Sequence, residues 1–340
     1  MHSTPSTAQA ARSLLSPYAA QPLLAIRDVY KTYSLKRGQT LRAVDGVSFT
    51  VMPGEVLGLV GESGCGKSTL GRCLLRLNDV SAGQIIFDGQ DITHLPERIL
   101  RPLRQQMQMV FQDSYASLNP RRRIGDLLAE PLRVHRTQDE HRHTSAAIVH
   151  RLEELMELVS LPRAALERYP HEFSGGQRQR INIARALVLS PRLVVADEPV
   201  SALDVSVQAQ IVNLFADLQK QLVLTYVFIA HDLAVVRQIS TRVAVMYLGV
   251  IVELGQTDAV LHNPAHPYTI ALTQAVPRPV VGAPRHVLLR GDIPSPVNKP
   301  AGCRFHTRCP AVQARCQSEA PILTQINPDH AVACHYPVLK

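Results

Sequence analysis

Short apolar runs alternate with longer segments of helical periodicity along this chain. Residues 23–33 and 41–51 have the pattern of antiparallel edge strands. Three later runs are short and mainly apolar, and each ends in glycine or polar residues: 55–61, 192–199 and 224–232. This combination predicts buried strands that lead into turns.

The segments between these strands are helical in pattern. Residues 124–160 are mainly helical, and residues 146–161 are the clearest amphipathic run. Strands with helices between them predict an α/β fold, in which a parallel sheet has helices on both faces. The longest apolar stretch, Val243–Val252, has ten residues and ends at Glu253. A membrane-spanning helix needs about 20 residues, so this stretch predicts buried strands.

The two ends of the chain differ from this alternating middle. Residues 1–22 lack the features of a secretory signal, and we interpret them as a disordered leader. Prolines become frequent after about residue 264, which predicts a linker leading to a small cysteine-bearing tail. The predicted domains are therefore a leader at 1–22, a main domain at 23–263 and a C-terminal segment at 264–340.

Composition narrows the class of protein only in part. Of the 340 residues, 46% are apolar and 19% are charged, which excludes an intrinsically disordered chain. The formal net charge of +8 favours anionic partners. Nucleotides, nucleic acid and an acidic membrane surface all fit this charge, which does not choose among them.

The strand at 55–61 leads into a glycine-rich sequence, GESGCGKST, at Gly61–Thr69. This sequence fits the phosphate-loop pattern, in which glycines let backbone N–H groups face the phosphates of a nucleotide. Lys67 adds positive charge at the β- and γ-phosphate oxygens, and Ser68 offers a hydroxyl to Mg²⁺. The start of the following helix adds partial positive charge. A merely structural glycine-rich turn would not require this spacing.

The strand at 192–199 ends in two adjacent carboxylates within LVVADE. Asp197 is placed to hold Mg²⁺ through water, and Glu198 is placed to orient the attacking water as a general base. Adjacent carboxylates also occur in solvated turns, but the buried strand and the upstream phosphate loop favour the catalytic interpretation. Together the two motifs predict a P-loop NTPase.

A third motif, FSGGQRQR at Phe173–Arg180, precedes a helical run. The hydroxyl of Ser174 and the N–H groups of Gly175 and Gly176 form a second anion site at a helix start. A chain with one phosphate loop has no obvious use for a second anion site of its own. The motif therefore predicts a dimer in which each chain closes over its partner's nucleotide.

These motifs resemble the ATP-binding cassette (ABC) family in order and spacing. The resemblance rests on GESGCGKST, Gln112 in MVFQD, FSGGQ, LVVADEP, SALD and His231 in FIAHD, and it spans about residues 23–255. It implies a RecA-like parallel-sheet core, an antiparallel β subdomain and a helical subdomain at about 113–175. It also implies that two such domains enclose two ATP molecules head to tail.

The resemblance further implies roles for single residues. Gln112 would sense Mg²⁺ and the γ-phosphate, His231 would contact the γ-phosphate, and Asp204 would couple the two ATP sites. The implied catalytic residues are Lys67, Gln112, Glu198 and His231, and the implied Mg²⁺ ligands are Ser68, Gln112 and Asp197. The implied ATP-binding set, with Tyr33 stacked on adenine, is Tyr33, Gly61, Glu62, Ser63, Gly64, Cys65, Gly66, Lys67, Ser68, Thr69, Gln112, Ser174, Gly175, Gly176, Gln177, Asp197 and Asp204.

A subgroup of the family can also be identified. SLNPR at 117–121, HPYT at 266–269 and the cysteine tail resemble the ATPase subunits of bacterial dipeptide and oligopeptide importers, and FSGGQRQRINIARAL resembles the second of their two sister ATPases. This resemblance implies a heterodimer with the sister ATPase, two membrane permeases, an external solute-binding protein and a place at the cytoplasmic face of the inner membrane. Nickel, glutathione, murein peptides and haem remain alternative solutes.

A soluble ABC ATPase that acts on nucleic acid is the alternative from another class. Chromosome-maintenance relatives need long heptad segments between the phosphate loop and FSGGQ, and residues 70–172 contain no sustained heptads. Translation-factor relatives carry two cassettes in one chain, whereas this chain has one. We therefore expect transport, with no nucleic-acid partner.

Four of the six cysteines gather near the C-terminal end: Cys303, Cys309, Cys316 and Cys334. In a reducing cytosol disulfides are disfavoured, which leaves free thiols, zinc or an iron–sulfur cluster. The spacing C-x5-C-x6-C-x17-C lacks the short pairs of most zinc sites but suits either metal centre. The resemblance to the importer ATPases, some of which hold a [4Fe–4S] cluster, implies ligation by all four thiolates and a structural role. Cys65 and Cys73 are expected to be structural.

Overall fold

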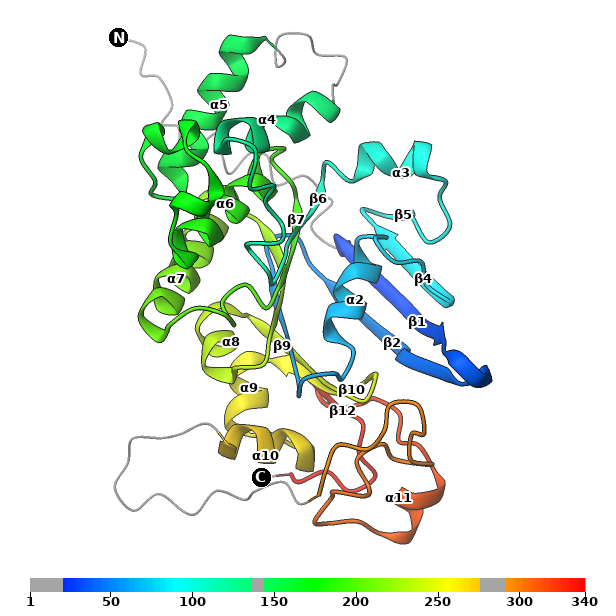
Figure 1. Cartoon of the computed structure of the whole chain (residues 1–340). Helices are drawn as coiled ribbons and strands as arrows, with labels where there is room; N and C mark the ends of the chain where they lie inside the picture. The colour runs from blue at the N-terminus through cyan, green and yellow to red at the C-terminus, as the bar shows by residue number, and fades with distance from the viewer. Residues whose placement is uncertain (1–20, 136–143, 276–290, 340) are drawn as a thin grey trace, which may run out of the picture.

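The computed structural model of the chain describes residues 21–135, 144–275 and 291–339 (Figure 1). The predicted leader therefore lies almost wholly outside the described residues. The centre of the fold is a sheet in the order β11-β12-β10-β9-β3-β8-β7-β6. The strands from β9 to β6 are parallel, and β10, β12 and β11 extend the sheet in antiparallel fashion. The bounds are β3 Val56–Val60, β6 Met107–Val110, β7 Leu193–Asp197, β8 Thr225–Ala230, β9 Arg242–Tyr247, β10 Val250–Gln256, β11 Thr324–Asn327 and β12 His330–Val332.

A second sheet is antiparallel, in the order β2-β1-β4-β5. Its strands are β1 Leu24–Ser34, β2 Thr40–Val51, β4 Ala82–Phe87 and β5 Gln90–Asp91. The expected antiparallel pairing is confirmed, since β1 pairs with β2 from Leu24↔Val51 to Ser34↔Thr40. The expectation that both are edge strands is wrong for β1, because β4 pairs with its other side. An alternating apolar and polar pattern indicates that one face of a strand is buried. It does not indicate how many neighbouring strands pair with that strand.

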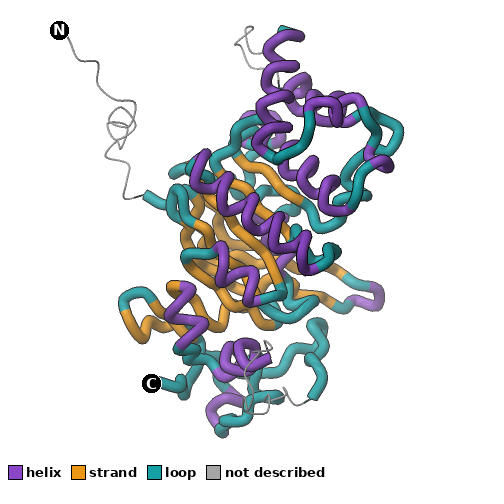
Figure 2. The backbone as a smooth tube through the Cα atoms, turned by 90° about the vertical axis from the view of Figure 1, so that its left-hand side faces the viewer, coloured by secondary structure: helices purple, strands orange, loops and turns teal. Residues whose placement is uncertain are grey.

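The main sheet is covered differently on its two faces. Successive side chains of a strand point to opposite faces. Val56 and Val60 therefore share a core with helices α6, α7 and α8, whereas Leu57 and Leu59 share a second core with helix α2 and the antiparallel sheet. Figure 1 shows α6, α7 and α8 on one side of the strands of the main sheet and α2 on the other, and Figure 2 shows helices laid over the strands on the first side. The helix bounds are α2 Lys67–Leu74, α6 Gly175–Leu187, α7 Val205–Leu222 and α8 Leu233–Ile239.

The helical pattern at 124–160 forms a group of helices at one end of the molecule, at the top of Figure 1. Leu128 on α4 and Leu155 on α5 are fully buried where the two helices pack together. Residues 136–143, between them, lie outside the described residues. The bounds are α3 Glu97–Leu103, α4 Ile124–Val134 and α5 Ser145–Leu158, with 3₁₀ turns η1 Lys36–Gly38, η3 Arg163–Glu167 and η4 Pro170–Glu172.

The C-terminal segment is more closely joined to the main domain than its prolines indicate. Helices α9 Thr257–His262 and α10 Pro267–Ala275 follow β10, and Tyr268 on α10 is fully buried. Pro267 occupies the first helical position, where a missing N–H leaves no intrahelical bond unmade. The expected linker thus begins with a packed helix, and residues 276–290 lie outside the described residues. Beyond the short helix α11 Ala314–Ser318, β12 pairs with β10 and joins the main sheet.

The apolar stretch Val243–Val252 forms buried strands of the main sheet, which confirms the prediction of buried strands. It contains most of β9 and the start of β10, which are joined by a turn with positive φ at Leu248 and Gly249. Across the described ranges, no helix has the length and apolar character that a membrane span requires.

Candidate functional site

The phosphate loop, Gly61–Thr69, connects β3 to α2 at the carboxyl end of the parallel strands. Its backbone takes conformations that only glycine adopts readily, with φ of 153° at Gly61 and 109° at Gly66. A Cβ atom at Gly61 would collide with the carbonyl oxygen of Met246, and one at Gly66 with that of Ala43. The glycines of the motif therefore let the loop pass close to neighbouring backbone.

Lys67 begins α2 and is almost fully buried, with 4% of its surface exposed. Its ammonium group donates hydrogen bonds to the carbonyl oxygens of Gly61 at 2.8 Å and Glu62 at 3.0 Å. These partners belong to the phosphate loop itself and carry no full negative charge. The loop thus holds the ammonium in place while its charge remains available to phosphate oxygens.

The two groups expected to hold Mg²⁺ meet directly. The hydroxyl of Ser68 donates a hydrogen bond of 2.7 Å to Oδ1 of Asp197, the last residue of β7. Burial raises the pKa of Asp197, while the bond from Ser68 acts in the opposite direction. One hydroxyl and one carboxylate are a small donor set, which suits Mg²⁺ because this ion keeps several waters and binds phosphates.

Glu198 lies at the centre of a second cluster. Its Oε2 accepts a hydrogen bond from Nε2 of Gln112 at 3.1 Å and lies 3.5 Å from Nδ1 of His231. These residues follow β6, β7 and β8, and parallel strands bring their carboxyl ends to one edge of the sheet. Glu198 also has a positive φ of 44°, unusual for a residue with a side chain. The fold thus brings together three of the four residues expected to be catalytic.

The FSGGQ motif forms the start of α6. Ser174 and Gln177 make a reciprocal capping box, with hydrogen bonds of 3.4 Å and 3.0 Å between side chains and backbone N–H groups. Gly176 lies so close to Val207 on α7 that a Cβ would collide with it. Asp204 caps α7 by accepting from the N–H of Val207 at 2.9 Å. In the described part of the chain, no hydrogen bond of Ser174 reaches the phosphate loop.

Tyr33 lies near the end of β1, apart from these clusters. Its hydroxyl accepts a hydrogen bond of 3.2 Å from Nδ2 of Asn78, which follows α2. The ammonium group of Lys31 lies 4.9 Å from the centre of its ring. The structure therefore places Tyr33 beside the segment that leaves α2, with its ring already in contact with a cation.

Comparison with known proteins identifies the family. Residues 44–201 match the ABC transporter family, and residues 252–316 match the C-terminal region of oligopeptide/dipeptide transporters. The oligopeptide transport ATP-binding protein AppF of Bacillus subtilis is 50% identical over 326 residues, which cover 93% of this chain and 97% of that protein. The chain belongs to the ATP-binding subunits of the oligopeptide/dipeptide ABC transporters. The ABC ATPase fold expected from the motifs is thereby confirmed.

Further relatives of this ABC subunit agree. A putative peptide import ATP-binding protein of Brucella ovis is 51% identical over 314 residues, covering 92% of this chain and 97% of that protein. The dimeric, post-hydrolysis ATP-binding cassette MJ0796 bound to ADP and Pi superposes with a TM-score of 0.62 at 26% identity, covering 69% of this chain and 98% of that one. CbiO1 of Clostridium perfringens superposes with a TM-score of 0.61 at 26% identity, covering 71% of this chain and 91% of that one.

The four tail cysteines of this ABC subunit line one small cavity, next to Phe305 and His266. Burial raises the pKa of the thiols of Cys303 and Cys309, and that of Cys334 to about 11. An iron–sulfur or zinc centre needs several thiolates in one place, and all four tail cysteines line the same cavity. However, no group of three or more His, Cys, Asp or Glu side chains in the described ranges is arranged to hold a metal ion. The donor chemistry fits a thiolate-bound centre, and the present side-chain positions do not form one.

One connection to the ATP site escaped the sequence analysis. Arg308, in the cysteine-bearing tail, forms an ion pair with Glu62 of the phosphate loop at 2.7 Å. The backbone N–H of Glu62 donates to the hydroxyl of Tyr268 at 2.8 Å. Tyr268 belongs to the HPYT sequence, which indicated only a subgroup, and no pattern marked Arg308. Contacts between residues 246 positions apart leave no local signal.

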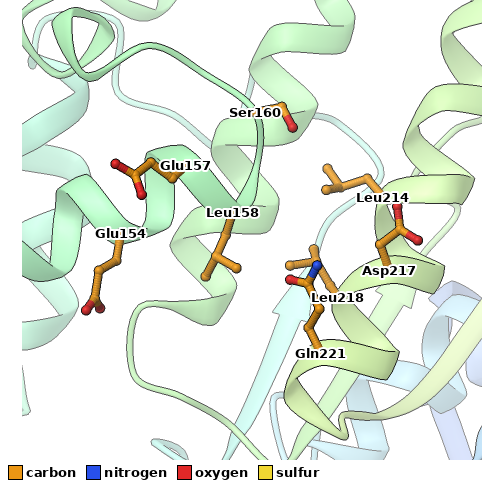
Figure 3. Close-up of a pocket in the computed structure, with 8 residues that line it drawn as sticks. All are labelled: Glu154, Glu157, Leu158, Ser160, Leu214, Asp217, Leu218 and Gln221. Atoms are coloured by element: carbon orange, nitrogen blue, oxygen red, sulfur yellow. The ribbon is translucent and has the colours of Figure 1, made fainter.

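A groove between α5 and α7 is a separate surface feature (Figure 3). Leu158 of α5 faces Leu214 and Leu218 of α7 across it, with Glu157 and Asp217 near its edges. None of the residues of the phosphate loop or of the cluster around Glu198 lines this groove. It is therefore not part of the candidate ATP site.

Proposed function

We propose that this chain binds and hydrolyses ATP to energise the uptake of dipeptides or oligopeptides across the cytoplasmic membrane. The observation that carries the proposal is the meeting of the Ser68–Asp197 pair and the Glu198 cluster beside the phosphate loop, in a chain with an oligopeptide/dipeptide C-terminal region. The names of the relatives, for oligopeptide transport and peptide import, support the same solute class. Nickel, glutathione, murein peptides or haem would be carried by the same type of subunit.

The proposed chemistry is positioning and charge neutralisation. Lys67 and the loop N–H groups bind the β- and γ-phosphates. Ser68, Asp197 and Gln112 would hold Mg²⁺, which would supply neutralising charge to the phosphate oxygens. Glu198 accepts a proton from the attacking water. His231, 3.5 Å from Glu198, is placed to contact both that carboxylate and the γ-phosphate. Tyr33 supports the adenine ring.

We propose that the partner of this chain is a sister ATPase, whose FSGGQ segment completes the ATP site in trans. Two observations support this arrangement. The capping box at Ser174 leaves the N–H groups of Gly175 and Gly176 at the helix start, and among the described residues no hydrogen bond joins Ser174 to the chain's own phosphate loop. The related MJ0796 cassette is dimeric in its post-hydrolysis state. Two permeases and an external binding protein complete the assembly, with this chain at the cytoplasmic face of the inner membrane.

The first prediction concerns the isolated chain. Alone it is expected to show weak or no ATPase activity, because its phosphate loop lacks the sister's FSGGQ segment. Co-purification with the sister subunit and permeases should restore turnover, and a peptide-loaded binding protein should stimulate it further. The measurement is phosphate release by the chain and by the complex, with solutes bound to the complex identified by mass spectrometry. Full, solute-stimulated activity from the isolated chain would contradict the heterodimer.

We also propose that the cavity lined by the four tail cysteines holds a [4Fe–4S] cluster through their thiolates. The convergence of four thiols on one small cavity supports this assignment, although their side chains must shift to become ligands. Metal binding would supply folding energy to a loop-rich segment with little core of its own. Zinc held by the same thiolates is the alternative.

The second prediction tests this centre. Anaerobically purified protein is expected to be brown, to absorb near ~400 nm and to hold about four irons per chain. Cys309→Ser should lose the colour and most of the iron, whereas Cys73→Ser, which removes a buried thiol outside the tail, should keep both. Iron and zinc are measured by elemental analysis. Colourless protein with one zinc per chain would show that the cysteines bind zinc and not an iron–sulfur cluster. Metal-free protein with an ordered tail would refute both assignments.

A further inference from the structure

The cysteine-bearing tail is fastened to the ATP-binding core by basic side chains. Lys299 and Arg304 both bind the carboxylate of Asp45 on β2, at 3.2 Å and 2.9 Å. Arg308 binds Glu62, the second residue of the phosphate loop. Figure 1 shows the tail, in orange to red, against the end of the main sheet below α2. The tail therefore has a direct ionic contact with the phosphate loop.

The contact between Arg308 and Glu62 is specific in geometry. Nη1 and Nη2 of the guanidinium donate to the two carboxylate oxygens at 2.7 Å and 3.1 Å, which makes the pair bidentate. The Arg308 side chain is 5% exposed and that of Glu62 is 22% exposed. The ring of Tyr247 lies beside the guanidinium, 6.0 Å from its centre. A pair so shielded from solvent is weakened little by salt and holds its partners in a fixed orientation.

Each polar group of Glu62 has a different partner. Its carboxylate binds Arg308, its N–H donates to the hydroxyl of Tyr268, and its carbonyl oxygen accepts from the ammonium group of Lys67. The tail and α10 thus hold one side of this residue, and the phosphate-binding lysine holds the other. A movement of Glu62 would move one of the two carbonyl acceptors that position Lys67.

Packing makes this anchor rigid. The rings of Tyr247 and Tyr268 lie 4.6 Å apart, and Phe305 packs edge-on to Tyr247 at 5.3 Å. Phe305 also lines the cysteine cavity, and its carbonyl oxygen accepts from the N–H of Arg308 at 3.0 Å. Side chains in close-packed surroundings of this kind transmit displacement instead of absorbing it. A change in the cysteine cavity therefore reaches Arg308 through directly contacting residues.

Charge gives the pair a function beyond fastening the tail. The loop binds an anion, yet Glu62 places a carboxylate within it. Without its partner this carboxylate would repel the phosphates of ATP and would be free to bind the ammonium group of Lys67. The bidentate ion pair neutralises the carboxylate and directs it toward the tail.

We propose that Arg308 is a positioning residue for the phosphate loop, through which the cysteine-bearing tail sets the nucleotide affinity of this subunit. It acts by neutralising Glu62 and by fixing the carbonyl oxygen that helps to place Lys67. The input is any event that moves residues 303–309, and the output is the dissociation constant for ATP. The proposal depends on ATP binding by this family and not on the identity of the solute or of a metal in the tail.

The third prediction tests the proposal by rescue. In the full-length chain, Arg308→Gln is expected to raise the dissociation constant for Mg-ATP about tenfold, within the usual range of coupling between sites. Adding Glu62→Gln in the same chain should recover most of the affinity, because the uncompensated carboxylate is then gone. Arg308→Lys, which keeps the charge but not the bidentate geometry, should lie between the two. In the assembled transporter, Arg308→Gln should raise KM with kcat little changed.

A matched control separates positioning from folding. Arg315→Gln also breaks an Arg–Glu pair in the tail, with Glu319, but that pair is about half exposed and does not touch the loop. Its affinity for ATP should match the wild type. Melting temperature and circular dichroism are measured for every variant, and affinities are determined well below the lowest melting temperature.

Three results would overturn the proposal. These are a folded Arg308→Gln chain with unchanged affinity, a double variant with no recovery, or an equal loss in Arg315→Gln. If Arg308→Gln fails to fold, Arg308→Lys decides, because an unchanged dissociation constant for Mg-ATP in that folded variant would contradict a role for the bidentate geometry of this pair. None of these results bears on ATP hydrolysis by the wild-type complex. A failure of this proposal therefore leaves the proposed function intact.

Discussion

Glu198→Gln is expected to preserve ATP binding and to lower the rate of hydrolysis at least ~10²-fold, as for the loss of a general base. The amide has the size of the carboxylate, so it can still accept from Nε2 of Gln112, which lies 3.1 Å from Oε2 in the wild type. It cannot take a proton from water. ATP would therefore remain bound and the dimer closed, which a stalled complex with unhydrolysed ATP would reveal.

A control variant at another glutamate separates the loss of the general base from the loss of any carboxylate. Glu97→Gln removes a carboxylate of the same type on α3, where it pairs with Arg104 and its side chain is 63% exposed. Its turnover should equal that of the wild type within about twofold, because exposed pairs contribute little. Phosphate release and nucleotide content are measured in the assembled transporter. Normal hydrolysis by the Glu198 variant would show that the general base lies elsewhere.

The residues around Glu198 show why much of this site could be predicted from sequence. Gln112, Glu198 and His231 lie far apart in the chain, yet each follows a short apolar strand. Once the strands are known to be parallel, their carboxyl ends must share one edge of the sheet. The roles of Gln112 and His231 came from the resemblance to the ABC family, and this topological rule explains why the two residues meet at Glu198. The direct contact of Ser68 with Asp197 follows from the same rule.

The C-terminal segment shows where this reasoning fails. Glu253 was predicted to be the polar end of an apolar run, whereas it is completely buried in the structure. Its carboxylate accepts from the N–H groups of Ala265 and His266 at 2.7 Å and 2.9 Å, and lies 2.6 Å from Nε2 of His330. These donors satisfy a buried charge. They come from the two residues before α10 and from β12, whose places are set by long-range contacts and not by periodicity.

The same cause explains the missed contact between tail and phosphate loop. A basic residue in a cysteine-rich segment has no periodic signal, and its partner Glu62 looked like an ordinary position of the GESGCGKST motif. The tail was expected to have a structural role, because metal binding would stabilise a segment with little core of its own. The bidentate pair of Arg308 with Glu62 places it against the ATP site instead.

Lys67→Ala is expected to abolish transport and to lower ATP turnover at least ~10²-fold, the loss typical of one preorganised electrostatic contact to the reacting group. Lys67 is 4% exposed in the wild type, and its ammonium group is held by the carbonyl oxygens of Gly61 and Glu62. Its removal takes away the positive charge nearest the phosphates and leaves both oxygens without this donor. Nucleotide affinity and turnover should therefore fall together, unlike the result for Glu198→Gln.

Two further variants complete the test of Lys67. One separates the charge of the side chain from its geometry, and the other is a control at a distant lysine. Lys67→Arg keeps the charge, but a planar guanidinium does not match a site shaped for a compact ammonium, so turnover should remain low. Lys220→Ala removes a lysine from the last turn of α7, away from the loop, and should leave turnover unchanged. Binding is measured with a fluorescent ATP analogue and turnover by phosphate release. If Lys67→Ala bound and hydrolysed ATP like the Lys220 variant, the phosphate loop would not be the site of catalysis, and the proposed mechanism would fail.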